Sequence, residues 1–141
     1  MSAATNTGPT LEQQRAAFAL KQIRELQYGN VKYDYYVSYV SALPATIVMN
    51  GLGQALTMLV AKAKGERKDA HRLLFDHIAA WLSQQIVELQ VSTNDLTQVI
   101  DALMASDQQV YVRAQAEAMA HLNWLKQFAR AYLKEKEGHG D

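Results

Sequence analysis

An uncharged, apolar segment between Tyr35 and Lys62 constrains this chain more than any other feature of its sequence. The segment is long enough to cross a bilayer. However, Pro44 splits it, and five polar residues dilute it: Ser38, Ser41, Thr46, Asn50 and Gln54. This pattern favours helix buried on most sides over a membrane span, which is the weaker alternative. We therefore expect a protein that does not contact a membrane and is cytoplasmic.

Two glycines lie inside this segment, in the run Asn50-Gly51-Leu52-Gly53-Gln54. Each glycine in a helix interior costs about 1 kcal/mol relative to alanine. The run does not match a nucleotide-binding fingerprint, because the third glycine, the preceding strand and the P-loop lysine are all missing. Without Cβ atoms, Gly51 and Gly53 allow a second helix to approach, and Asn50 and Gln54 share one helical face. We interpret the run as a close-packing segment within a continuous helix.

The rest of the chain has helical periodicity, and no run alternates convincingly at the period of a strand. The predicted helices span residues 10–29, 32–42, 44–64, 66–90, 94–105 and 106–135. Their bounds rest on the capping boxes Thr10-x-x-Gln13 and Ser106-x-x-Gln109, on Pro44 at a first helical position, and on Gly29-Asn30 and Gly65 at helix ends.

The helix at 66–90 has two apolar stripes, which predicts a central position with neighbours on two sides. One stripe is Ala70, Leu74, Ile78 and Trp81, and the other is Phe75, Ala79, Leu82, Ile86 and Leu89. The long last helix places Ala118, Leu122, Leu125, Ala129 and Tyr132 at core spacing. We therefore predict an all-α fold, a compact bundle of five to six helices with a long C-terminal helix.

The length of 141 residues fits one domain. We assign it to residues 10–136, with disordered tails at 1–9 and 137–141. The N-terminal tail is polar and predicts no signal peptide. With no cysteine, the chain has neither disulfides nor thiolate metal sites. Its formal net charge is zero, with a pI near 6.9, whereas free-standing nucleic-acid binders are usually basic. A nucleic-acid role therefore has to rest on local patches or on partner proteins.

Catalytic chemistry finds little support in the sequence. Glu117 and His121 are four residues apart and could begin a metal site, but a metal requires at least three protein ligands. His71 and His77 do not share a helical face, and no serine lies in a G-x-S-x-G context. We expect no catalytic residue, no metal and no cofactor. A hydrolase or metal enzyme is the least favoured class of function.

Basic and aromatic clusters are more informative. Lys62, Lys64, Arg67, Lys68 and Arg72 fall close together, and Lys126, Arg130 and Lys134 recur every four residues. Like charges at this spacing repel, and a phosphate partner would relieve that repulsion, although a solvated face explains the pattern equally well. The tyrosines at 33, 35, 36 and 39 could stack on bases, but helix packing is the favoured interpretation.

Two motifs resemble a known family. The first is Leu43-Pro44-x-x-Ile47-x-x-Asn50-Gly51-Leu52-x-Gln54-Ala55-Leu56. The second, on the last helix, is Tyr111-x-Arg113, Glu117-Ala118, Leu122-x-Trp124-Leu125-Lys126 and Ala129. Together they resemble the small subunit of the type III-B CRISPR effector (Cmr) complex, the fifth Cmr protein, over about 11–133. Met58 departs from this pattern, since the family often has an aromatic residue there.

The resemblance implies a non-catalytic, all-helical subunit of an RNA-guided antiviral complex. Such subunits stack as an inner filament, contact the large polymerase-like subunit and the backbone subunit, and help to line the groove of the guide–target RNA duplex. The candidate RNA contacts are Lys64, Arg67, Lys68, Arg72, Arg113, Lys126 and Arg130. Arg113 and Lys126 also match the family pattern, and the others rest on the clustering of basic residues. The candidate packing residues are Pro44, Asn50, Gly51, Leu52, Gln54 and Trp124. A helical protein–protein adaptor that never touches RNA is the alternative.

Overall fold

The structure is a computed structural model that describes residues 7–29, 32–92 and 94–134. These residues form six α-helices and one 3₁₀ turn, and no strand is found among them. The elements are α1 (Leu11–Tyr28), α2 (Tyr36–Asn50), α3 (Leu52–Ala63), α4 (Ala70–Gln85), η1 (Val87–Leu89), α5 (Gln98–Ala105) and α6 (Gln108–Tyr132). The predicted all-α bundle with a long last helix is thus confirmed. Most of the predicted tails, at 1–6 and 137–141, lies outside the described residues.

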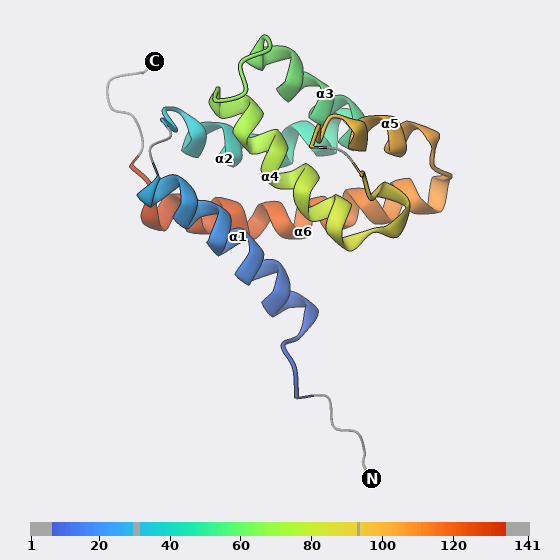
Figure 1. Ribbon diagram of the computed structural model, residues 1–141, viewed down its shortest axis with the longest axis horizontal. Helices are drawn as coiled ribbons and strands as arrows, with labels where there is room; N and C mark the ends of the chain where they lie inside the picture. The colour runs from blue at the N-terminus through green and yellow to red at the C-terminus, as the bar shows by residue number, and fades with distance from the viewer. Residues whose placement is uncertain (1–6, 30–31, 93, 135–141) are drawn as a thin grey trace.

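Helix α6 is the longest helix and runs horizontally through the lower part of the bundle in Figure 1. Both α1 and α2 pack against it, and α4 runs through the middle of the bundle, touching α1, α2, α3, α5 and α6. Every residue of the two predicted apolar stripes is buried, but the predicted helix at 66–90 ends at Gln85, so Ile86 and Leu89 lie beyond α4, the latter in η1. This two-sided burial explains why α4 occupies the centre. The first turn of α1 leads away from the bundle and is exposed (Figure 1).

Local capping signals set some of the helix bounds as predicted. Thr10 is the N-cap of α1, and its side chain and that of Gln13 form a reciprocal capping box. Gly29 is the C-cap of that helix. Lys64 and Gly65 end α3 with φ angles of 52° and 81°, so Gly65 does occupy the left-handed conformation that favours glycine.

Pro44 does not begin a helix, contrary to the prediction. It lies inside α2, which runs without interruption from Tyr36 to Asn50. One buried apolar face explains this continuity, since it extends along the whole helix through Tyr36, Val37, Val40, Leu43 and Ile47. The break occurs seven residues after Pro44, at Gly51, where the φ angle is 86°. The predicted helix at 44–64 is therefore the end of α2 followed by the whole of α3.

Other predicted bounds on the second half of the chain are also wrong. Ser106 does not cap α6; it is the C-cap of α5, and its hydroxyl donates to the carbonyl of Leu103 at 2.7 Å. The N-cap of α6 is Asp107, whose carboxylate accepts from the N–H of Val110 at 2.9 Å. Helix α4 begins later than predicted because Asp69 caps it, and α5 begins at Gln98. Tyr132, predicted in the core, is 40% exposed.

Candidate nucleic-acid interface

The connection between α3 and α4 carries three of the predicted RNA contacts. Lys64, Arg67 and Lys68 are all exposed there. The left-handed backbone at Lys64 turns the chain, and the side chain of Asp69 accepts from the N–H of His71 at 2.8 Å to begin α4. Three flexible cations are therefore held on one short, exposed connection. Phosphate groups are natural partners for such a cluster.

Arg72 does not belong to this exposed set. Only 6% of the residue is exposed, its Nε donates to Asp76 at 2.9 Å, and its Nη2 lies 3.6 Å from Asp95. The guanidinium also lies over the ring of Phe75. Burial raises the pKa of Asp76, although the bond to Arg72 opposes this shift. Arg72 is thus committed to ion pairs within the bundle, which argues against the predicted RNA contact.

The remaining three candidates lie on α6. Arg113 and Arg130 are exposed, Lys126 is half-buried, and the Nη1 of Arg113 lies 4.0 Å from the carboxylate of Glu88. Figure 1 shows the α3–α4 connection and α6 at opposite edges of the bundle. The structure therefore divides the predicted contacts into two separate basic edges rather than bringing them together into one surface.

The glycine run joins α2 to α3 and meets α6. Gly51 has φ 86° and ψ 160°, a conformation available essentially only to glycine, and it ends α2. Gly53 is buried, and a Cβ atom there would lie 3.1 Å from the hydroxyl of Tyr111 and 2.6 Å from the terminal methyl of Met104. The predicted close approach of another helix is confirmed for Gly53. The prediction of one continuous helix through the run is wrong, because α2 ends at Asn50 and α3 begins at Leu52.

Side chains of α6 cap the start of α3, where Leu52 and Gly53 are buried. The N–H of Leu52 donates to Oε1 of Gln115 at 3.0 Å, and the N–H of Gly53 donates to the hydroxyl of Tyr111 at 2.8 Å. The first N–H groups of a helix have no partner within the helix, so these bonds replace an ordinary N-cap. Asn50 and Gln54 lie on different helices, and both side chains remain exposed.

An apolar surface surrounds this junction. Gly53, Met58, Met104 and Tyr111 line a pocket of about 410 Å³ together with Asn50, Gln54 and Thr57. The helices that meet here also carry exposed large apolar side chains: Val48 and Met49 on α2, Met58 on α3, Met104 on α5 and Val112 on α6. Apolar side chains that gather in one patch mark a protein contact more often than an isolated apolar residue does.

Glu117 and His121 do not form a metal site. Glu117 accepts from Nε and Nη2 of Arg15 at 2.6 and 2.9 Å and from the indole N–H of Trp81 at 2.9 Å. The hydrogen bond from Arg15 is the main reason that the pKa of Glu117 is lowered. His121 is fully buried, with Nε2 2.9 Å from the side-chain oxygen of Gln22. No cluster of metal-ligating side chains occurs in the described ranges.

This buried polar network was not predicted from the sequence. It ties α1 to α4 and α6, and Arg15 and Glu117 are 102 residues apart. Trp124, predicted as a packing residue, also joins these elements, since its indole N–H donates to Glu12 at 2.9 Å and its ring stacks on Phe128. One local signal for this network was present in the sequence: Glu117 and His121 interrupt an otherwise apolar face of α6.

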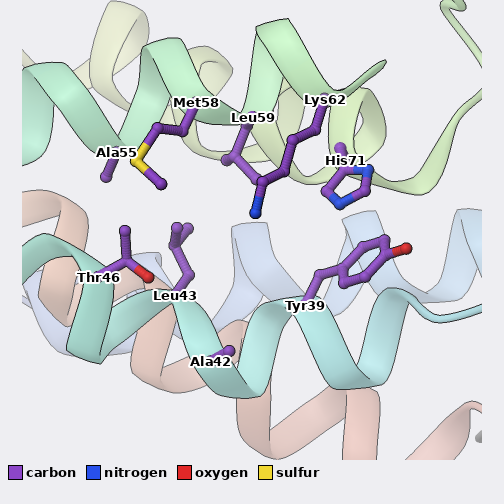
Figure 2. A pocket seen from close by; sticks show the side chains of 9 residues that line it. All are labelled: Tyr39, Ala42, Leu43, Thr46, Ala55, Met58, Leu59, Lys62 and His71. Carbon is purple, nitrogen blue, oxygen red and sulfur yellow. The ribbon is translucent and has the colours of Figure 1, made fainter. Parts of the chain in front are cut away.

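The tyrosine cluster is divided between the core and the surface. Tyr36 is fully buried, and its hydroxyl lies 2.6 Å from Nδ1 of His77. Tyr39 is half-buried, and its ring stacks on His71 with centroids 3.8 Å apart. Figure 2 shows the rings of Tyr39 and His71 at one end of a pocket between α2 and α3, with Lys62 beside them. Helix packing, which we favoured over base stacking for these tyrosines, is confirmed for Tyr36.

Within the described ranges, no helix is both long and apolar enough to cross a membrane. The uncharged segment that raised this question is divided between α2 and α3, so neither helix alone retains the full apolar length. Its apolar residues are used in the helical core instead, among them Val40, Leu43, Ile47, Leu56 and Leu59.

Comparisons with known proteins agree with the resemblance in the sequence. A protein described as CRISPR system Cmr subunit Cmr5, from Thermus thermophilus, is 27% identical over 126 residues, covering 89% of this chain and 98% of that protein. The crystal structure of a CRISPR-associated Cmr5 family protein from the same organism superposes with a TM-score of 0.70 at 26% identity, covering 90% of this chain and all of the other. The family of CRISPR-associated proteins named Cas_Cmr5 matches residues 11–132. The chain therefore belongs to the Cmr5 family of CRISPR-associated proteins.

Proposed function

We propose that this chain is a non-catalytic small subunit of a type III-B RNA-guided effector complex. In this role it stacks with further copies of itself as an inner filament, contacts the large and backbone subunits, and helps to line the target-RNA groove. Family membership supports the assignment to such a complex. The polar residues that could have suggested catalysis, Glu117 and His121, are committed to buried contacts within the bundle.

The observation that carries the RNA contact is the exposed cationic connection between α3 and α4. Lys64, Arg67 and Lys68 are exposed, and the nearby carboxylate of Asp69 already accepts hydrogen bonds from His71. The protein as a whole has no net positive charge, so three phosphate contacts give only modest affinity. Several copies side by side would multiply these modest contacts along one RNA.

Protein contacts are supported by a different surface. Three of the apolar residues near the α2–α3 junction, Met49, Met104 and Val112, are between 57% and 81% exposed. A subunit that stacks in a filament buries such residues against its neighbours. The same surface also supports the second candidate function, a protein–protein adaptor without RNA contact, so the two candidates differ only in the role of the cations.

Reconstitution of the complex distinguishes these two functions. We would compare the wild-type chain with Lys64→Ala/Arg67→Ala/Lys68→Ala in an assembled complex and measure target-RNA affinity against salt. Loss of three phosphate contacts should reduce the magnitude of the negative slope of log K against log salt by about 2 to 3 for each copy that contacts the RNA. A matched control is Lys21→Ala, which removes an exposed cation on α1. An unchanged slope with intact assembly would favour the adaptor.

A further inference from the structure

A small apolar pocket lies between α2 and α3 (Figure 2). Its volume is about 110 Å³, and small residues create it, since Ala42 on α2 and Ala55 on α3 line it. Leu43, Leu59 and Met58 supply further apolar lining. A closed apolar cavity of about 150 Å³ holds a benzene ring. This pocket is smaller but open on one side, so it has room for part of one six-membered ring, and a fused pair of rings fits it less well.

Polar groups surround this apolar interior. The side chain of Lys62 extends from α3 towards α2, so that its ammonium group lies across the pocket, and Thr46 places a hydroxyl at one end (Figure 2). At the other end Tyr39 stacks on His71, with the two ring planes 15° apart. Asp69 holds His71 in place, because its carboxylate lies 2.9 Å from Nδ1 of the imidazole. The groups around the pocket are therefore a cation, a hydroxyl and a pre-positioned aromatic stack.

A second, more polar pocket shares Tyr39 with the first. Its volume is about 200 Å³, and it is lined by Lys32, Asp34, Tyr35, Tyr39, Lys68, Asp69 and Ala70. Its charged side chains are two lysines and two aspartates, and the carboxylate of Asp69 also accepts a hydrogen bond from the N–H of His71. Tyr39 thus lines both an apolar pocket and a hollow in which two lysines are available to phosphate. Single-strand binding sites combine a basic path for the backbone with aromatic and apolar surfaces for the bases in this way.

We propose that the α2–α3 pocket binds the pyrimidine base of a single-stranded RNA nucleotide. The ring enters between Leu43 and Leu59, Lys62 binds an oxygen of the base or of its phosphate, and Lys68 and Lys32 reach a neighbouring phosphate across Tyr39. An apolar side chain of a protein partner would leave the ammonium group of Lys62 without a counterpart, which disfavours that occupant. The RNA identity of the ligand rests on the proposed function, whereas the size and polarity of the pocket do not.

Methyl NMR of the full-length chain tests this proposal directly. The probes are the methyl groups of Leu43, Thr46, Ala55, Met58 and Leu59, and the ligands are uridine monophosphate and single strands of about 15 uridines or adenines. The pocket-filling variant is Ala42→Phe, because Ala42 is exposed and lines the pocket. Its control is Ala45→Phe, an exposed residue of the same helix that does not line it.

The uridine strand should shift the pocket methyl signals and bind at least about fivefold more tightly than the adenine strand. Ala42→Phe should abolish both effects, Ala45→Phe should preserve them, and Lys62→Ala should weaken uridine binding more than Lys62→Arg does. Thermal unfolding of each variant checks that the fold is retained.

Four results would overturn the proposal, and they differ in what they mean for the function. Backbone amide shifts at Lys64, Arg67 and Lys68, recorded on the same samples, without shifts of the pocket methyl signals leave the phosphate contact standing and remove the base pocket. Equal binding of uridine and adenine strands removes the pyrimidine selectivity. Binding of the free nucleotide as tightly as the strand makes the ligand a small molecule rather than RNA. No shift anywhere overturns the pocket, and the reconstituted complex then decides the proposed function separately.

Discussion

The hydroxyl of Tyr111 on α6 accepts a hydrogen bond from the backbone N–H of Gly53 on α3 at 2.8 Å. The two residues are 58 positions apart, and the absence of a Cβ atom on Gly53 permits the contact. This bond and the neighbouring one from the N–H of Leu52 to Gln115 attach the start of α3 to the N-terminal part of α6. The motif that identifies the family is therefore also the junction at which three helices meet.

Removing this hydroxyl should destabilise the bundle. Tyr111→Phe leaves the buried N–H of Gly53 without its partner, and we expect the free energy of unfolding to fall by about 1–2 kcal/mol in urea titrations. Tyr132→Phe is the matched control, since Tyr132 is an exposed residue at the end of the same helix. An equal effect of the two variants would show that the capping bond contributes nothing.

A side chain at Gly51 should also be costly, for a backbone reason. Its φ of 86° with ψ of 160° lies where residues other than glycine are strained, so Gly51→Ala should lose about 1–3 kcal/mol of stability. Gly51→Leu should lose at least as much and impair folding or assembly. Gln54→Ala provides the control in the same urea titration, because Gln54 is an exposed residue in the first turn of α3. Wild-type stability of Gly51→Leu would contradict the conformational argument.

The ion pair between Arg15 and Glu117 should be sensitive to removal of one partner. Arg15→Met leaves a largely buried carboxylate with Trp81 as its remaining donor, and we expect a loss of roughly 3 kcal/mol. The double variant Arg15→Met/Glu117→Met should recover part of that loss, because it leaves no buried charge unpaired. A double-mutant cycle by chemical unfolding measures this coupling. Strictly additive losses would mean that the two residues act independently.

Stability should fall in mild acid because two histidines are held neutral. Burial lowers the pKa of His77 to about 4, and burial with the nearby His77 lowers that of His121 to about 3. The unfolded chain, with histidine pKa values near 6.5, binds more protons below that pH, so the free energy of unfolding decreases as the pH falls from about 6.5 towards 4. Each histidine contributes at most about 1.4 kcal/mol per pH unit.

Urea midpoints measured between neutral pH and mild acid check this dependence. His77→Gln and His121→Gln each remove one titrating group, so each should flatten the decline of stability with pH, even if its stability at neutral pH is lower. His71→Gln is the control, since His71 lies at the surface end of α4 and is bonded to Asp69. A slope that none of the three variants changes would assign the acid sensitivity to carboxylates instead.

Short-range patterns in the sequence determined most of the fold. The double stripe on α4 placed it in the centre, because a helix can bury two faces only between two neighbours. The Thr10 capping box set the start of α1, and the scarcity of strand-like alternation determined the all-α class. These predictions depend on residues within a few positions of each other, so the sequence alone suffices for them.

The wrong boundaries came from competition between equally good local signals. Pro44 is a good first residue of a helix, but the apolar face of α2 continues through it and outweighs the lost hydrogen bond. Ser106 and Asp107 are adjacent and both are favoured N-caps, so the sequence could not decide between them. Tertiary packing made these choices, because burial of a whole face outweighs one local preference.

The candidate sites show the same division. The sequence by itself determined the family motif, the absence of local catalytic signatures and the location of the basic clusters. Only the tertiary structure revealed that Arg72 is buried against Asp76, that α6 and the α3–α4 connection form separate basic edges, and that Lys62, Tyr39 and His71 surround one pocket. Exposure and long-range neighbours depend on how helices pack. The sequence pattern gives the position of each charge and the periodicity of the apolar residues. It does not show which partner each side chain contacts across the bundle.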